Sequence, residues 1–167
     1  MKISGRNLGR RLLLLGDRVA RIKYRKGHRV HSPFVYGFVR KVLMAKTLCE
    51  AAGITLYDSL IAEGMNAKRA RELHNTLFYI EGQSYAINDV GCDLSILLAD
   101  YPTEKLRAAY EEAKAEGVTL AICQPYANRE RQDEVKVLVE GHNSTTIDNR
   151  AYILFLNNRL PKQHFRL

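Results

Sequence analysis

The chain has 167 residues, 46% of them hydrophobic, and 26 Lys and Arg against 18 Asp and Glu, a net charge of +8. This length fits one domain with a sizeable core, and the composition is ordinary for a soluble globular protein. No apolar run approaches the ~18–20 residues of a membrane-spanning helix, so we expect no transmembrane segment.

Positive charge is concentrated at the N-terminus. Residues 1–50 hold 13 Lys and Arg against Asp17 and Glu50, a net of +11, so the remainder carries about −3. Such asymmetry points to a polyanionic partner, either nucleic acid or an anionic membrane surface. A solvated basic face without a specific partner fits equally well.

Residues 6–25 have the pattern of an amphipathic helix with one narrow apolar stripe. Its basic face can lie on a membrane, bind a nucleic-acid backbone or dock on its own domain. We favour docking because the stripe lacks aromatic anchors. The stripe is Leu8, Leu12, Leu15, Val19 and Ile22, and the candidate anion-binding residues are Arg18, Arg21, Lys23, Arg25, Lys26 and Arg29.

The three cysteines, Cys49, Cys92 and Cys123, form no C-x-x-C and no metal-like spacing. A reduced thiol state and a cytoplasmic location are therefore expected. The four leucines after Arg10 and Arg11 are shorter than the roughly 7–15 residues of a signal-peptide core, which argues against export. His28 and His31 lack further ligands nearby, so no metal site is expected.

A helix is predicted to begin at Pro33, because Ser32 can cap free N–H groups and proline suits the first helical position. Gly53 is expected to end this helix. A short helix or turn follows at 54–64. Asn66 is then expected to cap a helix that ends near Glu81-Gly82.

Strands and helices then alternate, which favours a parallel βαβ layer. The expected strands are 85–87, 94–99 and 118–123. The expected helices are 102–116, which Gly117 should end, and 128–140, which Asn128 should cap. Three strand-like runs close the chain at 144–148, 152–156 and 162–166. Their short connections require antiparallel neighbours.

Two distant groups of motifs resemble one family. The first is His28-Arg29-Val30-His31-Ser32-Pro33-Phe34-Val35-Tyr36; the second comprises Thr146-Ile147-Asp148, Ile153-Leu154-Phe155-Leu156 and Lys162-Gln163-His164-Phe165. Together they resemble a bacterial family of class I S-adenosylmethionine-dependent methyltransferases. The resemblance implies that residues 93–140 match the fourth and fifth strands of that fold with their helices, and that the chain ends in an antiparallel hairpin.

The departures from that family concern the cofactor. Class I methyltransferases hold it on a glycine-rich turn and an acidic residue, since glycines permit close backbone approach and a carboxylate binds ribose hydroxyls. This chain has no G-x-G, and only about 13 residues separate the helix ending near Ile80 from the strand at Leu94. The first three strands are therefore missing or reduced to 85–87. Asp100 is the remaining candidate for a cofactor-binding acid.

Other chemistry-bearing residues have structural interpretations. Cys123 is expected to be a buried thiol, and Asp93 and Asp100 flank a strand too far apart to act together. Glu111, Glu112 and Glu116 are interpreted as a solvated helix face, and His164 as a packing or hydrogen-bonding residue at the sheet edge. No catalytic residue and no metal ligand is assigned.

The sequence thus predicts an α/β fold, a reduced Rossmann-like methyltransferase sheet with an N-terminal helical segment and a C-terminal antiparallel hairpin. The expected division is a basic segment at 1–64 and a truncated domain at 65–167. The favoured function is a degenerate, non-catalytic methyltransferase-like protein, without cofactor, that associates with itself or a partner at the shortened sheet. The alternatives are an active small S-adenosylmethionine-dependent methyltransferase and a basic adaptor for nucleic acid or an anionic surface.

Overall fold

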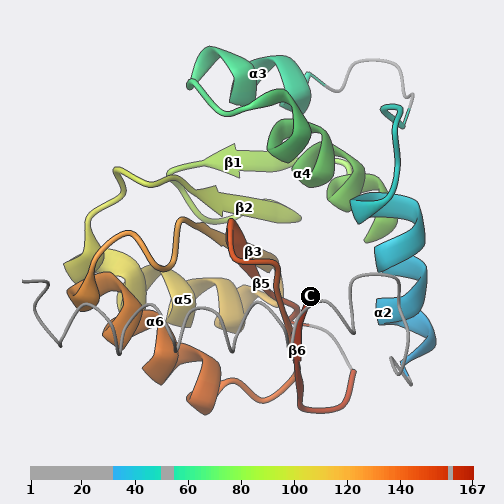
Figure 1. The fold of residues 1–167 in the computed structure, drawn as a ribbon. Coiled ribbons are helices and arrows are strands. Elements are labelled where there is room, and N and C mark those ends of the chain that lie inside the picture. Colours follow the sequence, from blue (N-terminus) through green and yellow to red (C-terminus); the bar gives the residue numbers. More distant parts are fainter. Residues whose placement is uncertain (1–31, 50–54, 158–159) are drawn as a thin grey trace, which may run out of the picture.

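The computed structural model describes residues 32–49, 55–157 and 160–167. Figure 1 shows one sheet with helices on both faces. The strands are β1 (Tyr85–Ile87), β2 (Leu94–Leu97), β3 (Thr119–Cys123), β4 (Thr145–Asp148), β5 (Tyr152–Phe155) and β6 (Gln163–Arg166). The helices are α2 (Pro33–Phe38), η1 (Val39–Leu43), α3 (Leu56–Ala62), α4 (Ala67–Tyr79), η2 (Thr103–Lys105), α5 (Leu106–Glu116) and α6 (Arg129–Gly141).

The six strands form one mixed sheet in the order β1-β2-β3-β5-β4-β6. β1, β2 and β3 are parallel, and β5 lies antiparallel between β3 and β4. The expected α/β class, a reduced Rossmann-like sheet with an antiparallel hairpin at its C-terminal end, is confirmed.

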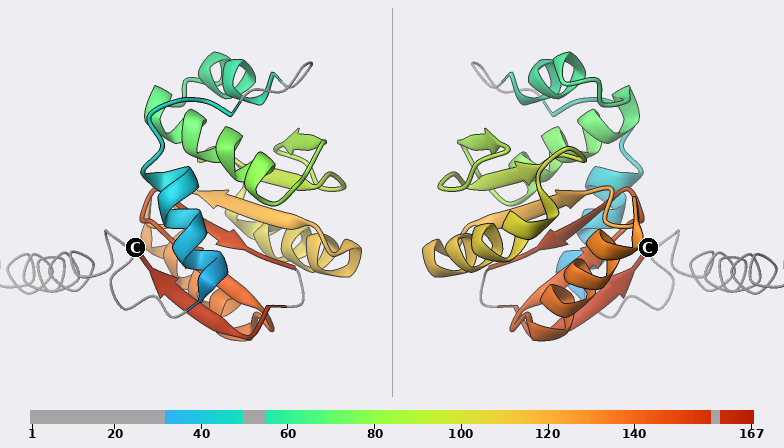
Figure 2. Two further views of the ribbon diagram at one scale, coloured as in Figure 1. Left: turned by 90° about the vertical axis from the view of Figure 1, so that its right-hand side faces the viewer. Right: turned by 90° about the vertical axis from the view of Figure 1, so that its left-hand side faces the viewer.

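The side chains of successive strand residues point to opposite faces of the sheet, which divides the core into two clusters. Ile96, Ala121 and Leu154 face a cluster with α2, η1, α3 and α4. Leu97, Ile122 and Phe155 face a second cluster with α5 and α6. Figure 2 shows α2 in front of the sheet in one view and α5 and α6 in front of it in the opposite view. Since side chains of successive strand residues point to opposite faces, the nearly continuous apolar runs fill both clusters.

The predicted helix starts are confirmed by their hydrogen bonds. The side chains of Ser32, Asn66 and Asn128 accept from the backbone N–H groups three residues later. Such a bond satisfies one of the donors that the first helical turn leaves free. The predicted stop of α5 is also confirmed, because Gly117 has a φ of 74°, which glycine adopts without steric cost.

Two expectations about the elements were wrong. The helix from Pro33 does not reach Gly53: α2 passes into the π-helical turn η1, which ends at Leu43. β6 does not neighbour β5, but pairs parallel with the far side of β4. The strands predicted at 85–87 and from Leu94 are confirmed, and they pair in parallel through residues 88–93 alone, because a three-residue strand needs a return path of only about 10 Å.

The expected boundary at 64/65 does not separate two cores within the described residues. Leu56 and Leu60 of α3 belong to the same buried cluster as Leu73 of α4 and Ile96 of β2. The predicted helix at 6–25 lies outside the described residues. None of the helices described here is long and apolar enough to cross a membrane.

A buried histidine makes the stability of this fold depend on pH. Burial lowers the pKa of His142, whose ring nitrogens contact the Tyr110 hydroxyl at 3.0 Å and the Leu156 carbonyl at 3.3 Å. A neutral ring satisfies both contacts if Nε2 donates to Leu156 and Nδ1 accepts from Tyr110. Protonation therefore favours the unfolded chain, whose histidine pKa is about 6.5.

We predict that urea unfolding will show full stability above pH 6.5 and a progressive loss as the pH falls below that value. The His142→Gln variant is expected to be less stable at pH 7.5 but to lose less stability between pH 7.5 and pH 5. Equal losses in the two proteins would contradict this assignment.

Candidate functional site

A cavity of about 500 Å³ lies at the carboxyl ends of β2 and β3. In open α/β sheets, this edge is where ligands bind, because loops after parallel strands converge there. We name it the carboxyl-edge cavity. Its lining comes from the turn between α3 and α4, the first turn of α4, the ends of β2 and β3, and the start of β5; it includes Met65, Arg69, Asp100, Cys123, Gln124 and Tyr152.

The backbone beneath this cavity is held by Arg131 from the first turn of α6. Its guanidinium donates to the carbonyl oxygens of Leu98 at 2.8 Å, Tyr101 at 2.8 Å and Cys123 at 3.1 Å. The side chain is 1% exposed, and burial lowers its pKa. One buried cation thus ties the end of β2 to the end of β3.

Two strands end at this edge in left-handed backbone conformations. Gln124, directly after β3, has a φ of 46°, and Asn88, directly after β1, has a φ of 56°. Gln124 N–H donates to the Ala151 carbonyl at 2.7 Å, and Leu98 N–H donates to Asn88 Oδ1 at 2.8 Å. These bonds offset a conformation that is uncommon for residues with a side chain.

Asp100 lies on the exposed rim of the carboxyl-edge cavity, where Asn88 Nδ2 contacts its Oδ1 at 3.4 Å. Asp93 stands at the opposite end of β2. Its Oδ2 accepts from Gln83 N–H, Ser84 N–H and the Ser84 hydroxyl, which lower its pKa. The two acids therefore do not share a site, as expected, and Asp93 is a turn residue.

Cys123 has the expected character of a structural thiol. It is 5% exposed, and burial raises its pKa to about 12. A thiol with that pKa is almost entirely protonated at neutral pH, and the thiolate is the reactive form. Cys49 and Cys92 are also free thiols, and both are half-buried.

No sequence pattern signals the ion-pair cluster beside the cavity. Glu72, 2% exposed, accepts from Arg69 Nη1 at 2.6 Å and from Asn149 Nδ2 at 3.4 Å, so α4 is tied to the turn before β5. The spacing of Arg69 and Glu72 is common on solvent-exposed helices, so nothing in the pattern signals burial. The burial of Arg131 likewise has no local sequence signal.

The other candidate residues keep their structural interpretations. Glu111, Glu112 and Glu116 are exposed on α5, and His164 at the sheet edge contacts the Thr146 hydroxyl at 2.6 Å. The six candidate anion-binding residues, together with His28 and His31, lie outside the described residues. Within the described ranges, no group of three His, Cys, Asp or Glu side chains could hold a metal ion.

Comparison with known proteins finds no family model, curated protein or solved structure that matches this chain. The resemblance to class I methyltransferases therefore depends on the motifs in the chain itself. The fold class depends on the sheet order and the placement of the helices.

We predict that Arg131→Met lowers the free energy of unfolding by about 3 kcal/mol, because the carbonyls of Leu98, Tyr101 and Cys123 lose a charged donor. Arg129→Met is the matched control on the same helix. Its side chain is 93% exposed, so a change within about 0.5 kcal/mol is expected. Similar losses in both variants, measured by urea unfolding, would show that Arg131 is not the tie between the strands.

We predict that native Cys123 is not alkylated by iodoacetamide at pH 8, while the half-buried Cys92 is. Peptide mass spectrometry resolves the three sites. In urea, all three thiols should react at similar rates, since the barrier at Cys123 is burial. Rapid native labelling of Cys123 would contradict its structural role.

Proposed function

We propose that this chain is a methyltransferase-like protein that does not transfer methyl groups and that associates with another copy of itself through β1. One observation carries the proposal. β1 is three residues long, turns back to β2 through residues 88–93 without a helix, and has no strand on its outer side within the described ranges.

The sheet supports the proposed ancestry. Of the motifs that resemble the family, Thr146-Ile147-Asp148 lies in β4, Ile153-Leu154-Phe155 in β5 and Gln163-His164-Phe165 in β6. β4 and β5 form the antiparallel hairpin that the resemblance implies. Ser32 and Pro33 of the N-terminal motif begin α2.

The connection after β1 argues against methyl transfer. In the family that this chain resembles, a glycine-rich turn leads from the first strand into a helix, and that turn approaches the cofactor closely. Here Gly91 has a φ of 108°, but residues 88–93 lead straight into β2. Neither a second glycine nor a helix N-terminus follows β1, so the expected absence of a cofactor remains our proposal.

The outer edge of β1 is suited to pairing with another strand. From the register with β2, the backbone groups of Ala86 face β2 and those of Tyr85 and Ile87 face outward. The side chains of β1 are half-buried rather than exposed, and the Tyr85 hydroxyl contacts Thr55 and Ser59 at 3.0 Å each. The edge is therefore held in place, and main-chain hydrogen bonds would supply the association.

An active small methyltransferase is the second candidate, favoured by the carboxyl-edge cavity with Asp100 on its rim. In that case S-adenosylmethionine would bind without the glycine turn. We also propose a cytoplasmic location, on the basis of three free cysteines.

We predict that S-adenosylmethionine and S-adenosylhomocysteine give no heat in isothermal titration and no shift in melting temperature at millimolar concentration. A ligand that binds the native state raises its stability, so a true site would be visible in both measurements. Micromolar binding that is lost in Asp100→Ala would overturn the non-catalytic assignment and support the enzyme.

We predict that light scattering after size-exclusion chromatography finds a dimer and that Ile87→Pro converts it to a monomer while lowering the melting temperature less than Ala86→Pro does. Proline at position 87 removes an outward-facing N–H, which an edge strand tolerates. Ala86→Pro is the control, because it removes an N–H that faces β2 and should destabilise the fold. A wild-type chain that stays monomeric at all concentrations would contradict self-association.

A further inference from the structure

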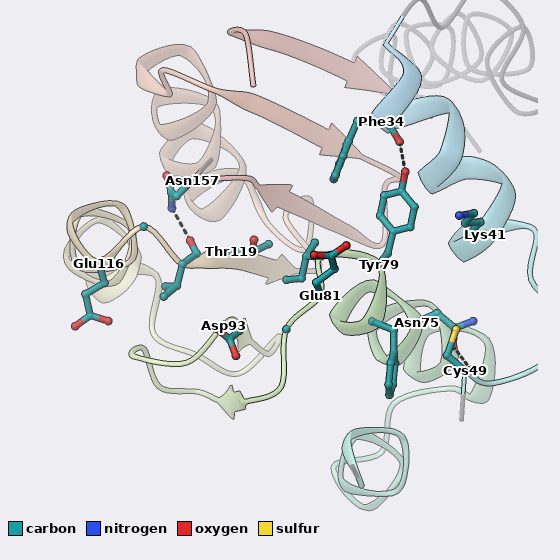
Figure 3. Close-up of a pocket in the computed structure, with 15 residues that line it drawn as sticks. Phe34, Lys41, Cys49, Asn75, Tyr79, Glu81, Asp93, Glu116, Thr119 and Asn157 are labelled. Carbon is teal, nitrogen blue, oxygen red and sulfur yellow. Dashed lines mark hydrogen bonds between the residues drawn. The ribbon is translucent and has the colours of Figure 1, made fainter. Parts of the chain in front are cut away.

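A second cavity, of about 810 Å³, opens at the other end of the sheet, where β2 and β3 begin (Figure 3). We name it the amino-end groove. It lies between the first turn of α2, the end of α4 and the turns that precede β2 and β3. None of the residues that line the carboxyl-edge cavity lines this groove.

The groove has an apolar wall that the fold holds firmly. The rings of Phe34 and Tyr79 meet edge to face at 5.0 Å, and the Tyr79 hydroxyl donates to the Phe34 carbonyl at 2.7 Å. At Gly37 the two helices approach so closely that a Cβ would collide with the Tyr79 hydroxyl. Phe78, Ile80 and Val118 extend this half-buried surface.

Carboxylates surround the apolar wall. Glu81, Asp93 and Glu116 line the groove and are exposed, while Lys41 is the one Lys or Arg among the lining residues that the structure describes. Hydrogen bonds from Gln83 and Ser84 lower the pKa of Asp93, so its carboxylate stays charged at neutral pH. The groove thus combines aromatic side chains with an acidic rim.

The N-terminal segment has the complementary character. Residues 1–31 contain 10 Lys and Arg against one acid, whereas the rest of the chain is close to neutral. On the predicted helix, Arg11, Arg18 and Arg25 recur every seven residues and form one row beside the apolar stripe of residues 8–22. An apolar stripe with a flanking row of cations matches an apolar wall with an acidic rim.

The attachment point also favours this match. The segment joins the described chain at Ser32, two residues before Phe34, which lines the groove. The six residues 26–31 can span up to about 20 Å when extended, enough for a helix at 6–25 to turn back onto the groove. The short tether therefore keeps the effective concentration of this segment at the groove high.

We propose that residues 6–25 dock in the amino-end groove of their own chain, with Leu8, Leu12 and Leu15 on the apolar wall. Arg11, Arg18 and Arg25 then face the carboxylates of Glu81, Asp93 and Glu116. In this arrangement the basic segment is an internal structural element of the domain, and three of its ten Lys and Arg residues face carboxylates of the same chain. This proposal is independent of association through β1 and of any cofactor.

The test uses the native thiols of the full-length chain. Cys49 lines the groove, whereas Cys92 is equally half-buried and does not line it. We expect the triple variant Arg11→Glu, Arg18→Glu, Arg25→Glu to raise the rate of Cys49 alkylation by iodoacetamide about tenfold, as release of a segment docked about 90% of the time would do. The rate at Cys92 should not change, and Cys123 should stay unreactive, which verifies the fold.

The chain offers a matched control with the same change of charge. Arg6, Arg10 and Arg21 lie on the opposite face of the predicted helix, so their replacement by glutamate should leave Cys49 protected. Adding Glu81→Arg and Glu116→Arg to the first triple variant should restore protection. Adding Glu111→Arg and Glu112→Arg, which reverse acids that do not line the groove, should not.

Three results would overturn the proposal. The first is equal Cys49 rates in wild type and both triple variants. The second is protection that increases with protein concentration, since the occupant would then be a second copy. The third is salt-sensitive binding of RNA or anionic vesicles that both triple variants lose equally while Cys49 rates stay constant, which would assign the segment to a polyanion.

Discussion

The carboxyl end of the sheet depends on the hydrogen bonds that the Arg131 guanidinium donates. This guanidinium joins carbonyls from β2, β3 and the loop before η2 in a place that water does not reach. Without it, the carbonyls of Leu98 and Cys123 would lose a charged donor in a buried region, and Leu98 would keep only the weaker bond from Tyr101 N–H at 3.3 Å. The cavity above, the left-handed turn at Gln124 and the position of Asp100 all require those strand ends to be fixed.

The reduced sheet follows from the length of β1. A three-residue strand can return to its parallel neighbour through six residues, so no crossover helix is needed between β1 and β2. A class I methyltransferase holds its cofactor on a glycine turn and a helix N-terminus after its first strand, and residues 88–93 form neither. The short return also leaves the outer side of β1 without a strand within the described residues, which is why we propose association in place of catalysis.

The two ends of the sheet now differ in character. The carboxyl end has a cavity at the position where α/β proteins bind ligands, beside a structural thiol and the ion pair of Arg69 with the buried Glu72. The amino end carries an aromatic groove with an acidic rim, next to the point where the basic segment joins. If the segment docks as proposed, three of its ten Lys and Arg residues face the acidic rim of the groove, while the chain keeps its net charge of +8.

The sequence by itself determined the elements whose signals are local. The caps at Ser32, Asn66 and Asn128, the stop at Gly117 and the apolar runs of β2, β3 and β5 depend on neighbouring residues, so the pattern predicted them correctly. The α/β class and the hairpin of β4 and β5 followed from the order and spacing of those elements.

The tertiary structure alone decided the rest, because it depends on contacts between residues far apart in the chain. Tyr79 contacts Phe34 across 45 positions, Arg131 reaches Leu98 across 33, and Glu72 meets Asn149 across 77. β6 pairs with β4 instead of β5 because the antiparallel place beside β5 is already occupied by β3. No local pattern records such pairings, so the buried ions, the two cavities and the early end of the first described helix became visible only in the folded chain.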